Sequence, residues 1–180
     1  MQSELRSPSR VPATMAAMAA LLVGTVACGD DPFAFDWNDR PDTVQLYSLA
    51  RPELNLVSAF NFLQNLPIQV ENPNSTGSWD VAVDTRDGAI VFLPPGALNV
   101  EGAARIATLE SMSLDDVTRA PSDTLLYVAD QAVRVEMGDV YVIRTNRQTG
   151  SFGRVCVYYA KVEAVAIDRV CGKRRRREVR

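Results

Sequence analysis

Short apolar runs separated by turn residues dominate the chain from residue 43 onward. The last three runs, Gln131 to Glu136, Asp139 to Thr145 and Arg154 to Asp168, are rich in β-branched and aromatic residues, and short turn segments separate them. Such runs predict β-strands, and short connections favour antiparallel neighbours because parallel strands need long crossovers. We therefore predict that these three strands form a meander.

Four earlier segments carry the same strand pattern. Residues 43–49 alternate apolar and polar side chains. Residues 78–83 and 89–93 flank a turn at Asp87-Gly88, and residues 103–110 form a further apolar run. Six to eight strands with few helices favour a sandwich or barrel. The sequence thus predicts a mainly antiparallel β-sandwich or open barrel with one or two short helices.

Two segments have helical patterns. From Glu53 to Leu66, apolar residues Leu56, Phe60 and Leu63 recur at helical spacing, and Pro67 would end the helix. Ser113 is placed to cap a single helical turn. We expect a helix in the first segment and one turn in the second.

The start of the chain has the features of a secretory signal. Arg6 and Arg10 precede a run over residues 14–27 that carries no charge, and small Ala27 stands directly before Cys28. Basic start, apolar run and small residues are the three parts of such a signal. The run is shorter than the roughly 20 residues that a membrane-spanning helix needs.

Thr25-Val-Ala-Cys28 resembles the lipobox of bacterial lipoproteins, although that family usually has Leu at the first position. The resemblance implies diacylglyceryl attachment to the Cys28 sulfur, signal cleavage before it and acylation of the new amino terminus. The alternative is an ordinary secretory signal followed by an unrelated cysteine. Gly29 stands where an Asp resembles an inner-membrane retention signal, which favours the outer membrane of the cell envelope.

Charge divides the rest of the chain. We interpret residues 1–27 as a signal peptide, 28–42 as a tether, 43–172 as one β-rich domain and 173–180 as a basic tail. Residues 28–172 hold 11 basic against 20 acidic residues, which argues against nucleic-acid binding. The tail, with six basic residues, has three interpretations: a disordered solvated end, a contact with anionic lipid phosphates, or a frameshifted end.

Cys156 and Cys171 form an even pair in an oxidising compartment, which indicates a disulfide. The segment between them, however, reads as one extended run, and fifteen extended steps span roughly 50 Å against the few ångströms of a disulfide. Buried thiols are therefore the preferred interpretation, and the bridge remains open.

The sequence contains no histidine. Histidine is the usual base near neutral pH and takes part in most nucleophile systems and many metal sites. The carboxylate pairs Asp30-Asp31 and Asp115-Asp116 are adjacent, and neighbours on a strand point to opposite faces. Asp84 to Asp87 lacks the ligand spacing of a calcium loop. We expect no catalytic residue, no metal and no cofactor.

Aromatic residues are the remaining candidates for ligand contact. Trp79 at the start of a strand is interpreted as a core anchor, with an exposed stacking platform as the alternative. Tyr158 and Tyr159 should point to opposite faces, and an exposed one beside Arg144 or Arg154 would make a ligand contact.

The β runs carry a second resemblance. Trp79-Asp-Val-Ala-Val83, and Val140 to Thr145 leading to Tyr159-Ala-Lys-Val162, resemble strand motifs of HmuY-type haem-binding surface lipoproteins. This implies an all-β fold on a lipid anchor. That family usually holds haem with a histidine pair, and in some relatives with methionine, so the ligand is not carried over to a chain without histidine.

Two functions remain open. The first is a non-catalytic, lipid-anchored envelope module that binds a small molecule, polymer or protein; an apolar cavity lined by Trp79, Phe92 or a tyrosine would favour it. The second is a structural or assembly lipoprotein that docks onto an outer-membrane partner; a long unpaired sheet edge would favour that.

Overall fold

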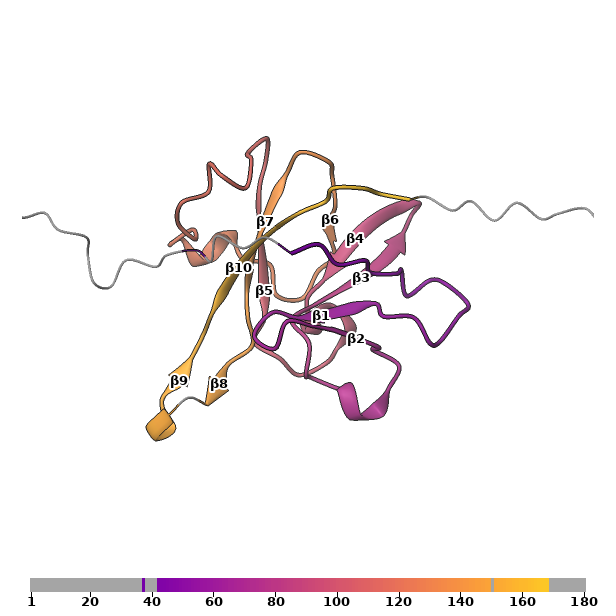
Figure 1. The fold of residues 1–180 in the computed structure, drawn as a ribbon, viewed down its shortest axis with the longest axis horizontal. Helices are drawn as coiled ribbons and strands as arrows, with labels where there is room; N and C mark the ends of the chain where they lie inside the picture. The colour runs from indigo at the N-terminus through magenta and orange to yellow at the C-terminus, as the bar shows by residue number, and fades with distance from the viewer. Residues whose placement is uncertain (1–36, 38–41, 150, 169–180) are drawn as a thin grey trace, which may run out of the picture. The chain divides into compact units, whose positions relative to one another are not determined.

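The structure is a computed structural model that describes residues 37, 42–149 and 151–168. Within these residues the chain forms antiparallel sheets and no α-helix, and the helical segments are short 3-10 turns (Figure 1). The prediction of a mainly β, antiparallel fold is confirmed. No helix in this part of the chain is long and apolar enough to cross a membrane.

Sheet A has five strands in the order β2-β1-β3-β4-β6. Their bounds are β1 Ala59–Asn61, β2 Leu66–Ile68, β3 Val81–Arg86, β4 Ala89–Leu93 and β6 Val133–Arg134. Sheet B has the order β10-β7-β5, with β5 Arg105–Leu109, β7 Val140–Arg144 and β10 Tyr159–Glu163. A third pair joins β8 Gln148–Thr149 to β9 Val155–Cys156. The 3-10 turns are η1 Pro73–Ser75, η2 Pro95–Leu98, η3 Thr124–Leu126 and η4 Ser151–Gly153.

The β3–β4 hairpin forms where the sequence predicts it. Asp87 and Gly88 connect the strands with φ angles of 51° and 76°. Two successive residues with positive φ match the right-handed twist of a two-residue hairpin, and Asp-Gly adopts this conformation at low cost. The strands pair from Arg86 opposite Ala89 to Ala82 opposite Leu93.

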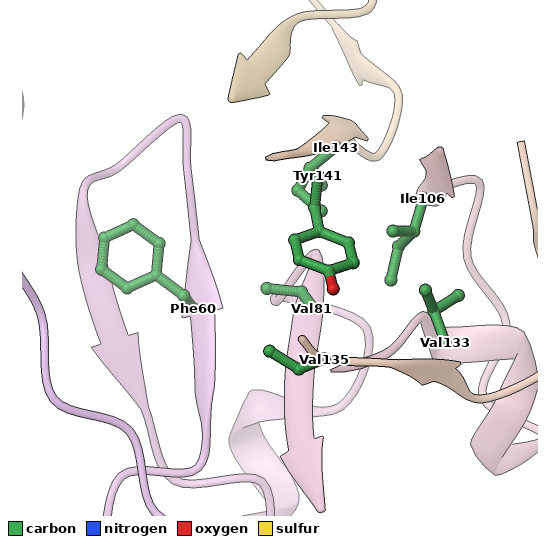
Figure 2. Close-up of a cluster of buried hydrophobic side chains, with 7 residues drawn as sticks. All are labelled: Phe60, Val81, Ile106, Val133, Val135, Tyr141 and Ile143. Carbon is green, nitrogen blue, oxygen red and sulfur yellow. The ribbon is translucent and has the colours of Figure 1, made fainter. Parts of the chain in front are cut away.

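One hydrophobic cluster joins the two large sheets. Tyr141 of β7 is fully buried, and its ring meets that of Phe92 from β4 edge-on, with 5.1 Å between centroids. Its hydroxyl accepts a hydrogen bond from Glu136 N (2.8 Å) and donates one to Arg134 O (3.0 Å). Figure 2 shows this cluster, whose buried members are Phe60, Val81, Ile106, Val133, Val135, Tyr141 and Ile143. Residues from both sheets therefore share one core.

Two further clusters lie on the outer faces of the sheets. Trp79, 1% exposed, packs with Ala59, Ala82, Val91 and Leu93 of sheet A. On sheet B, Ala107, Val140 and Val142 pack against Val117 and Tyr127 of the long β5–β6 connection. Each sheet thus buries both faces over part of its area.

The predicted helix from Glu53 to Leu66 is wrong. Ala59 to Asn61 form β1, and the chain turns back at Asn65, which has a φ of 52°, into β2. β1 lies between β2 and β3 and buries three consecutive residues, so packing on both faces overrides the helical spacing. Pro67 lies in β2 at the edge of the sheet, where proline is tolerated. The single turn predicted after Ser113 is present, and Asp116 N donates to Ser113 O (3.2 Å) and to the capping Ser113 Oγ (3.3 Å).

The predicted meander is confirmed for its last two strands, β7 and β10, and is wrong for its first strand, β6. β6 pairs with β4 in sheet A, whereas β7 pairs with β10 and β5 in sheet B. The turn at Gly138, with a φ of 89°, carries the chain from one sheet to the other. The predicted strand over residues 43–49 is wrong, since these residues join none of the described sheets; Tyr47 N and Leu49 N donate to Val57 O and Val83 O.

The run from Arg154 to Asp168 is not one strand. The run is interrupted between Cys156, which pairs with Gln148, and Tyr159, which pairs with Arg144. Cys156 and Tyr159 are three positions apart, whereas their partners are four positions apart. One extra residue on the β7–β8 side is the signature of a β-bulge. The break separates the β8–β9 hairpin from sheet B.

Candidate functional site

Two arginines and a tyrosine form a row across one end of sheet B. Arg105 of β5 lies opposite Arg144 of β7, which lies opposite Tyr159 of β10. Directly opposed residues on neighbouring strands point to the same face. Arg105 is exposed, and Arg144 and Tyr159 are half-buried. We call these three residues the arginine row.

Tyr127 borders the arginine row. Its ring centroid lies 6.2 Å from that of Tyr159, and its hydroxyl donates to Pro121 O at 3.0 Å. Burial is the largest cause that raises the pKa of Tyr127 to about 12, and the nearby Tyr159 adds to it. The guanidinium of Arg144 opposes this rise. Tyr127 is therefore a neutral phenol over the physiological pH range.

The charges of sheet B are separated along its strands. The arginine row stands at the end where β5 and β10 begin and β7 ends. At the opposite end, Glu110 follows β5, Asp139 precedes β7 and Glu163 ends β10. The ion pairs found among the described residues join Arg86 to Asp84 and Arg134 to Glu136, and neither includes an arginine of the row.

Asn146 holds the strands that carry the row. Its Oδ1 accepts hydrogen bonds from Ala103 N (2.7 Å) and Ala104 N (3.0 Å), directly before Arg105. Its Nδ2 donates to Trp79 O at 2.7 Å. A Cβ added to Gly102 would lie 2.8 Å from Pro95 Cβ and 3.0 Å from this Oδ1, so a larger residue would force its neighbours to shift. The start of β5 is thereby fixed beside the end of β7.

Asp80 anchors Asn146 in turn. The Asp80 side chain is buried, and its two oxygens accept hydrogen bonds from Asn146 N (2.8 Å) and Phe62 N (2.9 Å). Burial raises the pKa of this carboxyl, and the hydrogen bonds from Asn146 and Phe62 oppose the rise. These residues form a structural support behind the arginine row.

The structure separates the predicted ligand contacts. Trp79 is buried in the core, in agreement with the preferred interpretation, and is not available as a stacking platform. Tyr159 and Arg144 are brought together, but it is the half-buried tyrosine that lies beside the arginine. Tyr158 is 41% exposed and binds Thr145 through its backbone.

The predicted roles of the cysteines stay predictions. Cys156 is half-buried in β9. Cys28 and Cys171 lie outside the described residues, as do the signal peptide and the basic tail. The lipid attachment and the Cys156–Cys171 bridge are therefore untested.

Two polar cavities flank the turn between β6 and β7. One, of about 370 Å³, is lined by Arg134, Val135, Glu136, Met137 and Ile167. The other, of about 460 Å³, is lined mainly by polar side chains, among them Glu110, Ser111, Arg134, Glu136 and Asp139. Neither is the apolar, aromatic-lined cavity that the sequence predicts for a small-molecule binder.

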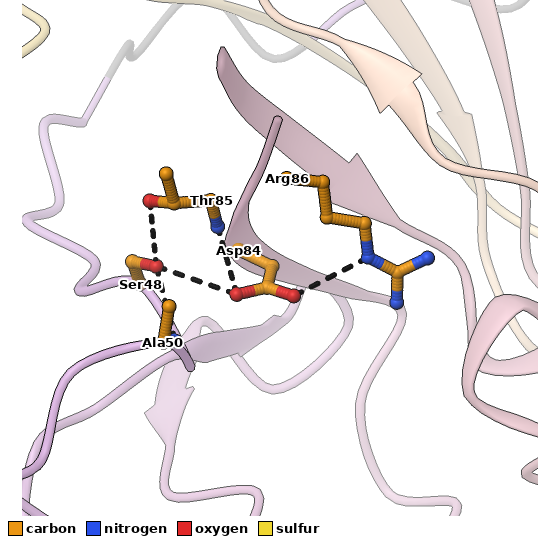
Figure 3. Close-up of polar contacts among 5 residues, drawn as sticks. All are labelled: Ser48, Ala50, Asp84, Thr85 and Arg86. Carbon is orange, nitrogen blue, oxygen red and sulfur yellow. Dashed lines mark hydrogen bonds and ion pairs between the residues drawn. The ribbon is translucent and has the colours of Figure 1, made fainter. Parts of the chain in front are cut away.

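A second polar cluster ties residues 48–50 to β3 (Figure 3). Ser48 Oγ donates to Asp84 Oδ1 at 3.4 Å and accepts from Thr85 Oγ1 (2.8 Å) and Ala50 N (3.2 Å). One donor and two acceptor positions exhaust a hydroxyl group. Arg86 Nε completes the cluster at 3.3 Å from Asp84 Oδ2. Ser48 therefore has a structural role, since its hydroxyl fixes residues 48–50 against β3.

Sequence reasoning missed Arg105, which enters the site only through the pairing of β5 with β7. One pattern could have indicated the region. Residues 140–162 contain four basic residues and no acidic one, in a chain with more acidic than basic residues. In the described part of the chain, no group of three or more His, Cys, Asp or Glu side chains could hold a metal ion.

Comparison of the chain with protein-family models, curated proteins and solved structures found no match.

Proposed function

We propose that the protein is lipid-anchored at Cys28 in the cell envelope, in the outer membrane, and that its β domain is a non-catalytic binding module. The ligand is an anionic group, a phosphate or carboxylate, held at the arginine row. The lipobox-like sequence supports the anchor, and the absence of histidine from the chain supports a role without catalysis.

The observation that carries the binding proposal is the position of Arg105 directly opposite Arg144. Like charges at opposed positions of a β ladder repel each other. Neither guanidinium takes part in the ion pairs found among the described residues. An anion between them would remove the repulsion, and guanidinium groups bind phosphate and carboxylate through two parallel hydrogen bonds.

The edges of sheet A give less support to docking by strand addition. Its edge strands β2 and β6 have three and two residues, and β2 contains Pro67. Short edges and proline are the usual means of preventing strand addition. This observation counts against strand addition at the edges of sheet A.

The experiment is a titration of the isotope-labelled protein with inorganic phosphate at constant ionic strength, followed by NMR. We expect saturable shifts of the amides at Arg105, Arg144 and Tyr159. Arg144→Gln should weaken binding by about tenfold or more, because a hydrogen bond to a charged group contributes about 1.5–3 kcal/mol.

Arg86→Gln is the matched control, since it removes the same charge from sheet A, and we expect it to leave binding unchanged. Equal weakening by both variants would mean that phosphate responds only to net charge. That result, or shifts that do not saturate, would contradict the proposed site.

A further inference from the structure

The tip of the β8–β9 hairpin presents an apolar side chain to solvent. Phe152, between the two strands, is 100% exposed, and its φ of 63° is in the left-handed region. A bulky residue rarely adopts this conformation because its side chain crowds the backbone. Val155, at the start of β9, is 64% exposed. In Figure 1 the hairpin extends beyond the ends of β7 and β10, away from sheet A.

The hairpin is basic. Arg147 and Arg154 are both exposed, one before β8 and one before β9. Residues 140–162 contain no Asp or Glu, so no acidic residue lies near these arginines along the chain. An exposed aromatic side chain flanked by arginines is complementary to an anionic lipid surface, since the ring enters the interface while the arginines reach the phosphates.

We propose that the tip of the β8–β9 hairpin inserts Phe152 into an anionic membrane surface, with Arg147 and Arg154 on lipid phosphates. The contact rests on the proposed function only in that the anchor at Cys28 brings the domain to a membrane. It orients the domain on the bilayer and does not depend on the arginine row.

Leu125 shows why exposure alone does not lead to this inference. It is 91% exposed in η3, nearly as much as Phe152. Its backbone N, however, donates to Asp123 Oδ1 at 2.9 Å, so a carboxylate lies beside it. Anionic lipid would be repelled there. Leu125 is therefore a matched control position for a membrane probe.

The test uses the full lipidated protein in vesicles of phosphatidylcholine and phosphatidylglycerol whose acyl chains are brominated. Bromine quenches tryptophan fluorescence only at contact. We expect Phe152→Trp to lose fluorescence beyond the wild-type protein, which already contains Trp37 and Trp79. Leu125→Trp should match the wild type. Adding Arg147→Gln and Arg154→Gln to Phe152→Trp should remove the extra loss.

Equal quenching of both probes, or of neither, on protein that sediments with the vesicles would overturn the hairpin contact and leave the lipid anchor standing. Extra quenching that persists in pure phosphatidylcholine after both arginines are replaced would overturn the role of the anionic headgroup. A protein that does not sediment with the vesicles would contradict both the anchor and the hairpin contact.

Discussion

The backbone N–H of Asn146 donates to Asp80 Oδ1 at 2.8 Å, although the two residues lie 66 positions apart in the chain. Asp80 directly precedes β3 of sheet A, and Asn146 follows β7 of sheet B. Phe62 N donates to the other carboxylate oxygen at 2.9 Å. A single buried side chain therefore connects the two sheets and the β1–β2 turn.

Asp80→Asn should lower the free energy of unfolding by about 1–3 kcal/mol. Both carboxylate oxygens accept from backbone N–H groups, so the amide of asparagine would place a donor against a donor. Denaturation in urea measures the change. Ser78→Ala, which removes an exposed hydroxyl, is the control and should change stability less. Equal stability of Asp80→Asn and wild type would show that the carboxylate is not needed.

The same carboxyl predicts a pH dependence. Burial raises the pKa of Asp80 in the folded state, so the folded chain binds the carboxyl proton more tightly than the unfolded chain does. The stability it contributes is present below the ordinary carboxyl pKa and is lost as pH rises through the raised value. The stability difference between wild type and Asp80→Asn should therefore be largest in acid and decrease toward neutral pH. An increase with pH would reverse the assigned direction.

Ser58→Ala should raise stability or leave it unchanged. Ser58 Oγ is buried and has no hydrogen-bond partner among the described residues, so the hydroxyl has lost its water without compensation. Removing it should stabilise the fold by up to about 1 kcal/mol. Ser48→Ala makes the same chemical change where Oγ has three partners, and it should destabilise. Thermal unfolding of both variants gives the comparison; a destabilised Ser58→Ala would mean that its hydroxyl is satisfied.

Tyr127 should ionise later than an ordinary tyrosine, with a pKa of about 12 against 10.0. The stability contributed by its neutral phenol is present below about pH 10 and is lost as pH rises through 12. Ultraviolet titration of the folded protein measures ionisation. Tyr127→Phe should delete one late step, and deletion of an early step would contradict the assignment.

Cys28→Ala should abolish labelling of the protein by palmitate and release it from membranes after signal removal, or leave it uncleaved. Several acyl chains on one cysteine give firm membrane attachment, whereas a single chain binds only marginally. Cys156→Ala is the control because its thiol is half-buried in β9, and it should keep the label. Palmitate on a Cys28→Ala protein would contradict the proposed anchor.

Local patterns predicted the elements whose partners are close in sequence. The β3–β4 hairpin appears as expected because both strands and the turn at Asp87-Gly88 lie within one short segment. The helix from Glu53 to Leu66 was wrong because β1 is defined by its pairing with β3, which helical spacing does not encode. The meander was right for β7 and β10 and wrong for β6, because β6 joins β4, more than 40 positions earlier.

The candidate site divides in the same way. Arg144 and Tyr159 could be named from the sequence as an arginine and a tyrosine in strand-like runs. Arg105 could not, because its place opposite Arg144 depends on the pairing of β5 with β7 and on the amide of Asn146. The sequence also left open which of Tyr158 and Tyr159 is the exposed one. The connection that carries Tyr127 covers Tyr159 and leaves Tyr158 exposed.

By itself the sequence determined the antiparallel β class, the turn at Asp87-Gly88 and the burial of Trp79, because alternation, turn conformation and side-chain hydrophobicity act within a few residues. Only the tertiary structure decided which strands share a sheet, where the arginine row stands, and that Asp80 meets Asn146. Backbone groups of any two strands are chemically alike, so their pairing is chosen by the packing of the shared core and not by either strand alone.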